Sequence, residues 1–143
     1  MKTNIFSTAF VDVQADEVDN IVYIFWKKQP DMEHYKEPFD FVIHEYSKDR
    51  NVNAMISDIR NQGIVGPQHR NWLQKEATPY AKSKGVICYG VISDSNIFKT
   101  YYVNTILSLV SGKDDVERKL FNDIESCEQW VRKQIAKKLN KAA

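Results

Sequence analysis

Three polar side chains, Asp58, Arg60 and Glu76, are the residues of this sequence best placed to do chemistry. Asp58 and Arg60 end a strand predicted over Val52–Ile59, and Glu76 lies on the helix predicted after it. Ligands of open α/β sheets bind at the carboxyl ends of the strands, so these groups are candidates for a ligand or partner site. A purely structural role is the alternative interpretation, in which Arg60 bonds Glu76 or Asp58 and anchors the loop.

Sequence motifs of catalysis and cofactor binding do not occur. The sequence has no Gly-x-Ser-x-Gly elbow, Gly-x-Gly-x-x-Gly fingerprint or Walker loop, and Gly63 and Gly66 stand alone. The histidines have neither a second histidine nor a cysteine at metal-ligand spacing; they are His34, His44 and His69. Both cysteines fall on apolar positions of predicted elements, as buried reduced thiols do. We therefore expect no catalytic residue, no metal and no cofactor.

Composition excludes several other classes of function. The 143 residues have the size of one domain, which we place over 1–143. Twenty basic residues against 19 acidic ones give a net charge of +1, which argues against nucleic acid as a partner. The basic residues near the C-terminus are typical of a helix end. No apolar run approaches the ~20 residues of a membrane helix, and no signal peptide is visible, so we expect a cytoplasmic protein of the bacterial type.

The first part of the chain predicts a hairpin and a helix. Alternating residues over Ile5–Val13 indicate one strand, and Ile21–Trp26 indicates a second that is apolar on both faces. Asp31 is placed to cap the following helix, and at Pro38 we expect a kink or a restart of the helix. The helix carries a single apolar stripe, formed by Met32, Tyr35, Phe39, Val42, Ile43 and Tyr46.

After the hairpin, strands and helices alternate. The later strands are predicted over Val52–Ile59, Val86–Ile92 and Lys119–Asn122. The later helices begin at Pro67, contain Phe98, and begin at Asp123. The order β-β-α-β-α-β-α-β-α predicts an α/β fold with a mixed sheet of about five strands and about four helices.

Several residues at the ends of these elements form a recognisable ordered set: Trp26, Asp58, Arg60, the run 72–79, Gly85, Phe98, Phe121, Glu128, Gln129 and Trp130. This set resembles the SpoIIAA-like family, within the wider group of STAS and SEC14/CRAL-TRIO-like domains. The resemblance implies a β/α superhelical fold and a non-enzymatic role. Relatives act as regulatory interaction modules or bind apolar ligands.

One departure from the family pattern concerns phosphorylation. STAS antagonists switch through a phosphorylated serine at the start of the second helix, but the corresponding stretch 58–66 contains neither serine nor threonine. Ser57 lies inside the predicted strand and is not equivalent. We therefore expect no phosphoserine switch of that type.

Aromatic residues on the helices leave two readings open: a plain core with hydroxyls reaching water, or an apolar pocket between helices and sheet. We expect Trp72 to be buried against the sheet and Glu76 to reach back toward Arg60. The candidate ligand or partner site is Asp58, Arg60, Trp72, Glu76, Tyr80 and Phe98. The leading hypothesis is a module for protein interaction or regulation. The alternative is a carrier or sensor of a small apolar, lipid-like ligand; an enzyme of unrecognised type comes third, and homodimerisation stays open.

Overall fold

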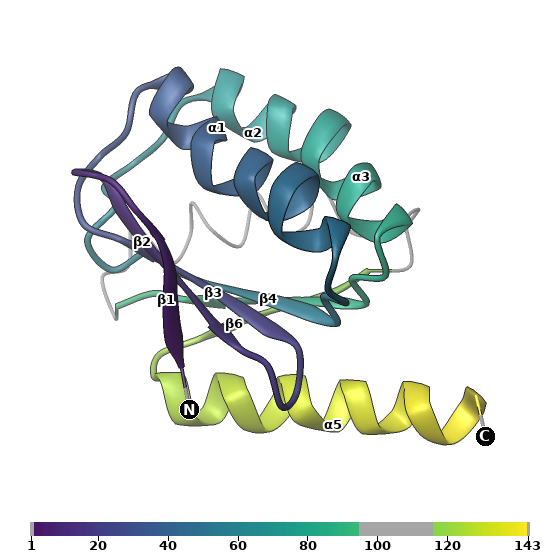
Figure 1. Ribbon diagram of the computed structural model, residues 1–143. Coiled ribbons are helices and arrows are strands. Elements are labelled where there is room, and N and C mark those ends of the chain that lie inside the picture. Colours follow the sequence, from purple (N-terminus) through teal and green to yellow (C-terminus); the bar gives the residue numbers. More distant parts are fainter. Residues whose placement is uncertain (1, 95–115, 143) are drawn as a thin grey trace.

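A six-stranded sheet forms the centre of the molecule, and strands that follow one another along the chain are neighbours in it (Figure 1). The computed structural model describes residues 2–94 and 116–142. The strands are β1 (Thr3–Ser7), β2 (Val11–Asp16), β3 (Ile21–Trp26), β4 (Ala54–Asp58), β5 (Cys88–Ile92) and β6 (Glu117–Phe121). The pairs β1–β2 and β2–β3 are antiparallel, and β3 to β6 are parallel. The mixed sheet with an antiparallel start is thus confirmed.

The strand expected over Ile5–Val13 is two strands, which is why the sheet has six strands where about five were expected. The chain reverses after Ser7: the backbone N–H of Thr8 donates to the carbonyl of Val11 at 2.9 Å. The N–H of Phe10 donates to the hydroxyl of Thr8 at 3.0 Å. Because this turn contains neither glycine nor proline, the alternation of the sequence runs through it without a visible break.

The first helix begins directly after Asp31, as predicted. α1 (Met32–Asp40) continues into a π-helical turn, η1 (Phe41–Glu45), and a short 3-10 turn, η2 (Tyr46–Lys48). Asp31 caps α1 by accepting a hydrogen bond from the backbone N–H of His34 at 2.9 Å. The helix passes through Pro38, and the apolar stripe stays in phase beyond it, with Tyr35, Phe39, Val42, Ile43 and Tyr46 all buried.

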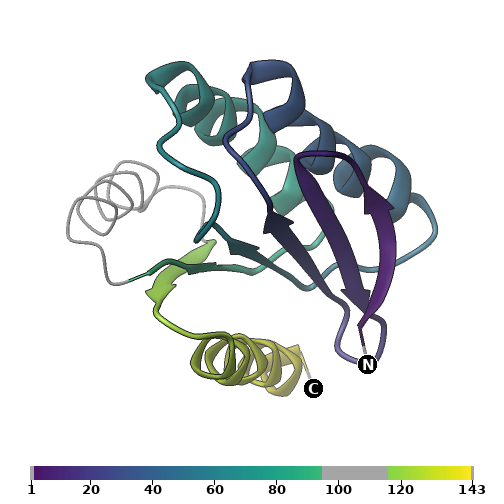
Figure 2. The same ribbon diagram turned by 90° about the vertical axis from the view of Figure 1, so that its left-hand side faces the viewer.

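The second helical unit also contains a π-helical turn. It consists of α2 (Pro67–Trp72), η3 (Leu73–Ala77) and α3 (Thr78–Ser83), with Pro67 in the first turn of α2. Pro79 has no N–H to continue the α-helical ladder, and the turn before it is wide: the N–H of Thr78 donates to the carbonyl of Leu73. This unit and α1 lie side by side on one face of the sheet (Figures 1 and 2).

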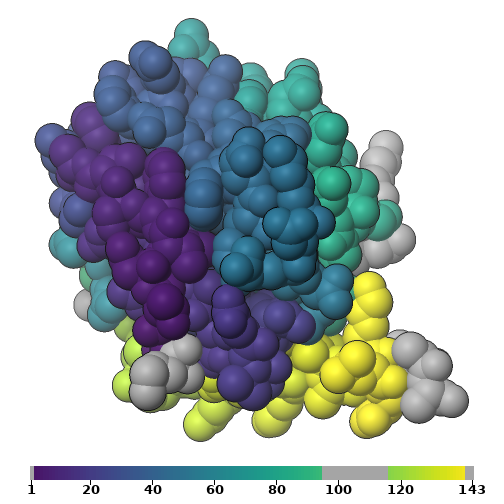
Figure 3. Space-filling model, in the orientation of Figure 1, coloured from purple at the N-terminus to yellow at the C-terminus, as the bar shows by residue number. Residues whose placement is uncertain are grey.

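The last helix, α5 (Ile124–Ala142), lies across the opposite face (Figures 1 and 2). Asp123 caps it, accepting from the backbone N–H of Ser126 at 2.8 Å. In the view of Figure 3, α1 and η1 form much of the surface above the first strands, and α5 lies below them. The molecule therefore has three layers: two helical units, the sheet, and α5.

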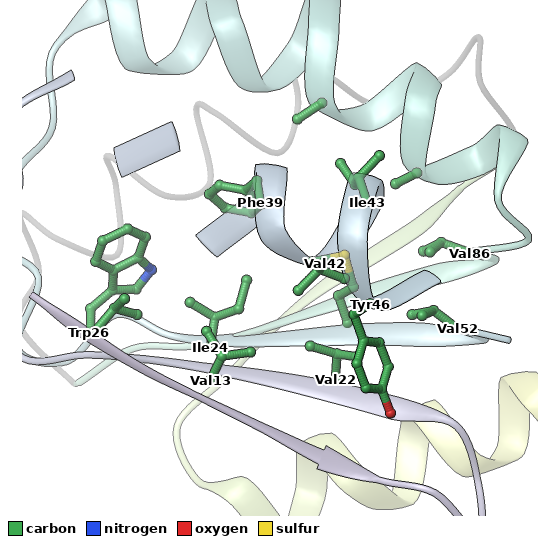
Figure 4. Packing of buried hydrophobic residues seen from close by; sticks show 14 of the residues in the cluster. Val13, Val22, Ile24, Trp26, Phe39, Val42, Ile43, Tyr46, Val52 and Val86 are labelled. Atoms are coloured by element: carbon green, nitrogen blue, oxygen red, sulfur yellow. The ribbon is translucent and has the colours of Figure 1, made fainter. Parts of the chain in front are cut away.

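Each face of the sheet has its own apolar core. The core under α1, shown in Figure 4, includes Val13, Val22, Ile24, Trp26, Phe39, Val42 and Ile43. The core under α5 includes Ile21, Tyr23, Ile56, Cys88, Cys127 and Val131. Both cysteines are buried and free, as expected. The parallel strands β3, β4 and β5 contribute buried residues to both cores, so these three strands are largely apolar on both sides.

The helix predicted around Phe98 lies outside the described residues. Of the helices within 2–94 and 116–142, none has the length and apolar character that crossing a membrane requires.

Candidate functional site

The carboxyl end of β4 holds the first pair of predicted site residues, Asp58 and Arg60. Asp58 is buried, and its carboxylate accepts from the guanidinium of Arg60 through two nitrogens: Nε to Oδ1 at 2.9 Å and Nη2 to Oδ2 at 2.5 Å. The backbone N–H of Arg60 donates to Oδ1 as well, at 3.1 Å. The hydrogen bond to Asp58 raises the pKa of the Arg60 guanidinium above its ordinary value. A paired, multiply bonded carboxylate of this kind fixes the start of a loop.

Of the two partners considered for Arg60, the structure has Asp58. Glu76 lies in η3 with its side chain exposed, and in the described ranges 2–94 and 116–142 it forms no ion pair with Arg60. The expectation that Glu76 reaches back to Arg60 is therefore wrong. Asp58 and Arg60 are two residues apart at the end of a strand, so their side chains meet locally. Glu76 instead lies on the outer surface of the helical layer.

Trp72 contacts the neighbouring helix, which corrects the expectation that it is buried against the sheet. It is half-buried, and its ring centroid lies 6.1 Å from that of Tyr35 and 5.8 Å from that of Phe39, both on α1. The apolar contact made by Trp72 is therefore one between helices. Tyr80, further along on α3, is 49% exposed.

Two cross-helix contacts join the helical units on their outer side. The ammonium of Lys36 lies 5.8 Å from the centre of the Trp72 ring, and the ring of His44 lies 4.7 Å from that of Tyr80. Lys36 and His44 belong to α1 and η1, and both contacts join residues that are 36 apart in sequence. The two helical units therefore keep the same residue offset at both contacts along this surface.

Two carboxylates occupy the positions midway between these contacts. Asp40 is four residues from Lys36 and from His44, and Glu76 is four residues from Trp72 and from Tyr80. Both side chains are exposed, and Asp40 lies 4.0 Å from Nε2 of His44. We call this region the two-helix surface; its residues are Lys36, Asp40, His44, Trp72, Glu76 and Tyr80.

Half of the two-helix surface was missed in the sequence. Lys36, Asp40 and His44 repeat at intervals of four, as do Trp72, Glu76 and Tyr80. That shared interval is the signal, because residues four apart lie on one side of a helix. Seeing it as one surface requires knowing that the two helical units lie side by side.

A small pocket lies between the helices and the sheet. Its volume is about 20 Å³, which is room for about one water molecule. Both π-helical turns reach it, through Ile43 and Leu73. Its other lining residues include Phe39, Met55, Ala77, Thr78, Val86, Tyr89 and Arg118. Tyr80 lies on the outer surface and is not part of this lining, and Phe98 lies outside the residues that the structure describes.

No group of three or more histidine, cysteine, aspartate or glutamate side chains suited to hold a metal ion occurs in 2–94 or 116–142. Ser57, which was considered for phosphorylation, is 2% exposed and accepts a hydrogen bond from the hydroxyl of Tyr89 at 2.7 Å. A kinase could not reach its hydroxyl in the folded protein.

Comparison with known proteins gives a fold. No family model and no curated protein matches the sequence. Among solved structures, the chain is similar to an uncharacterized protein of the DUF3478 family with a SpoIIAA-like fold, from Shewanella loihica PV-4. The TM-score is 0.52 and the sequence identity 12%, over 89% of this chain and 98% of that chain. Such an identity speaks for the fold and not for an activity. The chain therefore has a SpoIIAA-like fold, as the residues at its element ends predicted.

Proposed function

We propose that this chain is a non-enzymatic module that binds another protein through the two-helix surface. The observation that carries the proposal is the position of Asp40 and Glu76, two exposed carboxylates flanked by the rings of Trp72 and Tyr80. Carboxylates pair with guanidinium and ammonium groups, and aromatic faces attract the same cations. The partner we expect is therefore a protein that presents lysine or arginine side chains.

Exposure of the aromatic residues supports an interface over a purely structural role. Tyr80 is 49% exposed, although burial of the large apolar ring of a tyrosine is favourable. Tryptophan, tyrosine and arginine are the residues most enriched among those that dominate binding energy at protein interfaces. A basic partner would cover the ring of Tyr80 and compete with Lys36 for the face of Trp72.

Site-specific crosslinking tests the proposal. A photo-reactive amino acid placed at Tyr80 should capture one protein in the native cells, while the same group at Lys137 of α5 should not. The captured protein is then purified and its affinity measured by calorimetry. Asp40→Lys and Glu76→Lys should each weaken binding by about tenfold or more, because they set like charges against each other. Asp49→Lys, an exposed change beyond η2, is the matched control. Equal affinity of all three variants for the captured protein would overturn the proposal. Capture of a second copy of the chain would mean that the surface forms a homodimer.

The small pocket favours a second candidate function, that of a carrier or sensor of an apolar ligand. Its lining is mostly apolar, and it lies between two helical units that both contain π-helical turns. Sites for drug-sized ligands have volumes of roughly 300–1,000 Å³, so the helices would have to move apart. Native mass spectrometry of protein purified from its own cells decides this candidate: a retained lipid-like mass supports it, and the bare chain mass counts against it.

A further inference from the structure

Buried polar atoms without a hydrogen-bond partner gather near the carboxyl ends of the parallel strands. Among the described residues, Nε1 of Trp26, both ring nitrogens of His69 and the hydroxyl of Ser93 are buried and make no hydrogen bond. Trp26 is 2% exposed and Ser93 is 0% exposed. Buried polar groups in folded proteins are nearly always bonded, so a group of exceptions needs an explanation.

Trp26 and Ser93 belong to one row across the sheet. Phe25, Asp58 and Ile92 are aligned in the parallel register of β3, β4 and β5. The ladder continues for one more bond, from the N–H of Ile59 to the carbonyl of Ile92 at 2.9 Å. The next residues, Trp26 and Ser93, therefore stand on the same side of the sheet, with one strand between them. Two strand spacings put their backbones about 10 Å apart.

His69 joins this row through the ring of Tyr35. The Trp26 ring stacks on Tyr35 with centroids 5.5 Å apart, and the His69 ring meets Tyr35 edge-on at 5.0 Å. Figure 4 shows Trp26 in the layer between the sheet and the helices. His69 belongs to α2, one of the helices of that layer. The three groups thus come from β3, from α2 and from the residue after β5.

The chemistry of these groups selects a ligand with acceptor oxygens. The indole N–H can only donate, while the imidazole and the hydroxyl can each donate a proton to a ligand. Because the backbones of Trp26 and Ser93 are about 10 Å apart, a ligand with more than one polar group suits these residues better than a single water molecule. Arg70, next in the chain after His69, adds positive charge to this end of α2.

We propose that this region binds a small carboxylic acid. One carboxylate oxygen accepts from Nε1 of Trp26, the other accepts from His69, and a second polar group of the acid bonds the hydroxyl of Ser93. The position agrees with the general location of ligands in α/β sheets, at the carboxyl ends of the strands. The proposal does not rest on the two-helix surface, so either can fail without the other.

Proton–nitrogen NMR of the indole groups tests it directly, because the sequence has only three tryptophans. The Trp26 signal is assigned from Trp26→Phe, and the protein is titrated with acetate, succinate and benzoate, with succinamide as the uncharged comparison. The expected result is a saturable downfield shift of the Trp26 indole proton with at least one acid, while Trp72 and Trp130 stay in place. Magnetisation transfer from ligand protons to the Trp26 N–H shows direct contact without any substitution.

Variants then test the composition of the site. His69→Phe keeps the ring without its nitrogens, and Ser93→Ala removes only the hydroxyl; each should weaken binding by about tenfold or more. Trp130→Phe and Ser83→Ala are the matched controls and should bind as the wild type does. Thermal melts confirm that each variant is folded. An indole signal that no acid shifts, and that exchanges magnetisation with water only, would overturn the proposal. The proposal would also be overturned if His69→Phe and Ser93→Ala bound the acid with the same affinity as the wild type.

Discussion

The sulfur of Cys127 on α5 occupies the space where a side chain on Gly90 of β5 would have to lie. A Cβ at Gly90 would overlap with Sγ of Cys127, whereas Val131 and Ile56 would be at ordinary contact distances of 3.6 and 3.7 Å. Glycine therefore lets α5 pack closely on the middle of the sheet. Cys88 and Cys127 both belong to the core that this packing closes.

Gly90→Ala should destabilise the protein by about 1–3 kcal/mol, because the added methyl overpacks this contact. Cys127→Ala removes the overlapping sulfur, so adding it to Gly90→Ala should restore part of the loss. Urea unfolding followed by circular dichroism measures both effects. Gly66→Ala is the control: its Cβ would meet nothing closer than Nδ1 of His69 at 3.9 Å, so its melt should be near that of the wild type. The overlap would be contradicted if the double variant lost as much stability as Gly90→Ala and Cys127→Ala lose together.

Arg60→Ala should destabilise the fold by about 1–2 kcal/mol, since it leaves the buried Asp58 carboxylate without its charged partner. The Arg60 side chain is 45% exposed, which keeps the loss below that of a fully buried pair. Arg60→Lys should recover little, because an ammonium cannot form both hydrogen bonds.

Double-mutant cycles separate the two partners that the sequence suggested for Arg60. Asp58→Asn combined with Arg60→Ala should cost less than the sum of the single changes. Glu76→Ala combined with Arg60→Ala should be additive, and Glu76→Ala alone should be close to neutral. Coupling between Arg60 and Glu76 in urea melts would show that the pair forms in solution.

The sequence predicted β3, β4 and β5 because each of them is a short, mainly apolar run between polar turns. It predicted the cap of α1 at Asp31 and the start of the last helix at Asp123, because both residues stand directly before apolar stripes. It did not reveal the turn at 8–10, where apolar alternation continues from one strand into the next. Turns without glycine or proline leave no local signal of this kind.

Candidate residues were predicted less well than elements, for a geometric reason. Asp58 and Arg60 are two residues apart, so their pairing at a strand end follows from local geometry. The contacts of Trp72 and Tyr80 depend on how two helices are aligned, and that alignment is set by packing on a shared sheet. The unpaired nitrogens of His69 depend on three elements at once, which no spacing in the sequence encodes.

Both cysteines should resist thiol reagents in the native protein. Burial raises the pKa of Cys88 to about 12 and that of Cys127 to about 12, and the thiolate is the reactive form. With Ellman's reagent at neutral pH, we expect no rapidly reacting thiol in buffer and two in urea. A rapid reaction of one equivalent in buffer would mean that α5 leaves the sheet readily. Cys127→Ala and Cys88→Ala would then show which thiol is exposed.

The contact between Tyr23 and Glu128 joins α5 to β3 near the turn between β2 and β3. The Tyr23 hydroxyl donates to the Glu128 carboxylate. Two cations complete the group: Nζ of Lys2 lies 3.3 Å from the Glu128 carboxylate and 4.8 Å from the centre of the Tyr23 ring, and Arg132 pairs with Asp19 at 2.8 Å. These polar contacts fix the position of α5 along the sheet.

Tyr23→Phe should lower the free energy of unfolding by about 1 kcal/mol at neutral pH, the usual value of one hydrogen bond. It should also make the decrease of stability at alkaline pH less steep. Burial, and then the hydrogen bond to Glu128, raise the pKa of Tyr23 well above its ordinary value. The neutral phenol is therefore favoured in the folded state, so its contribution is complete below about pH 10 and declines as the pH rises further. Urea midpoints measured from pH 8 upward should fall more steeply for the wild type than for Tyr23→Phe. Tyr80→Phe, at an exposed ring, should follow the wild-type curve, and parallel curves for wild type and Tyr23→Phe would contradict the pairing.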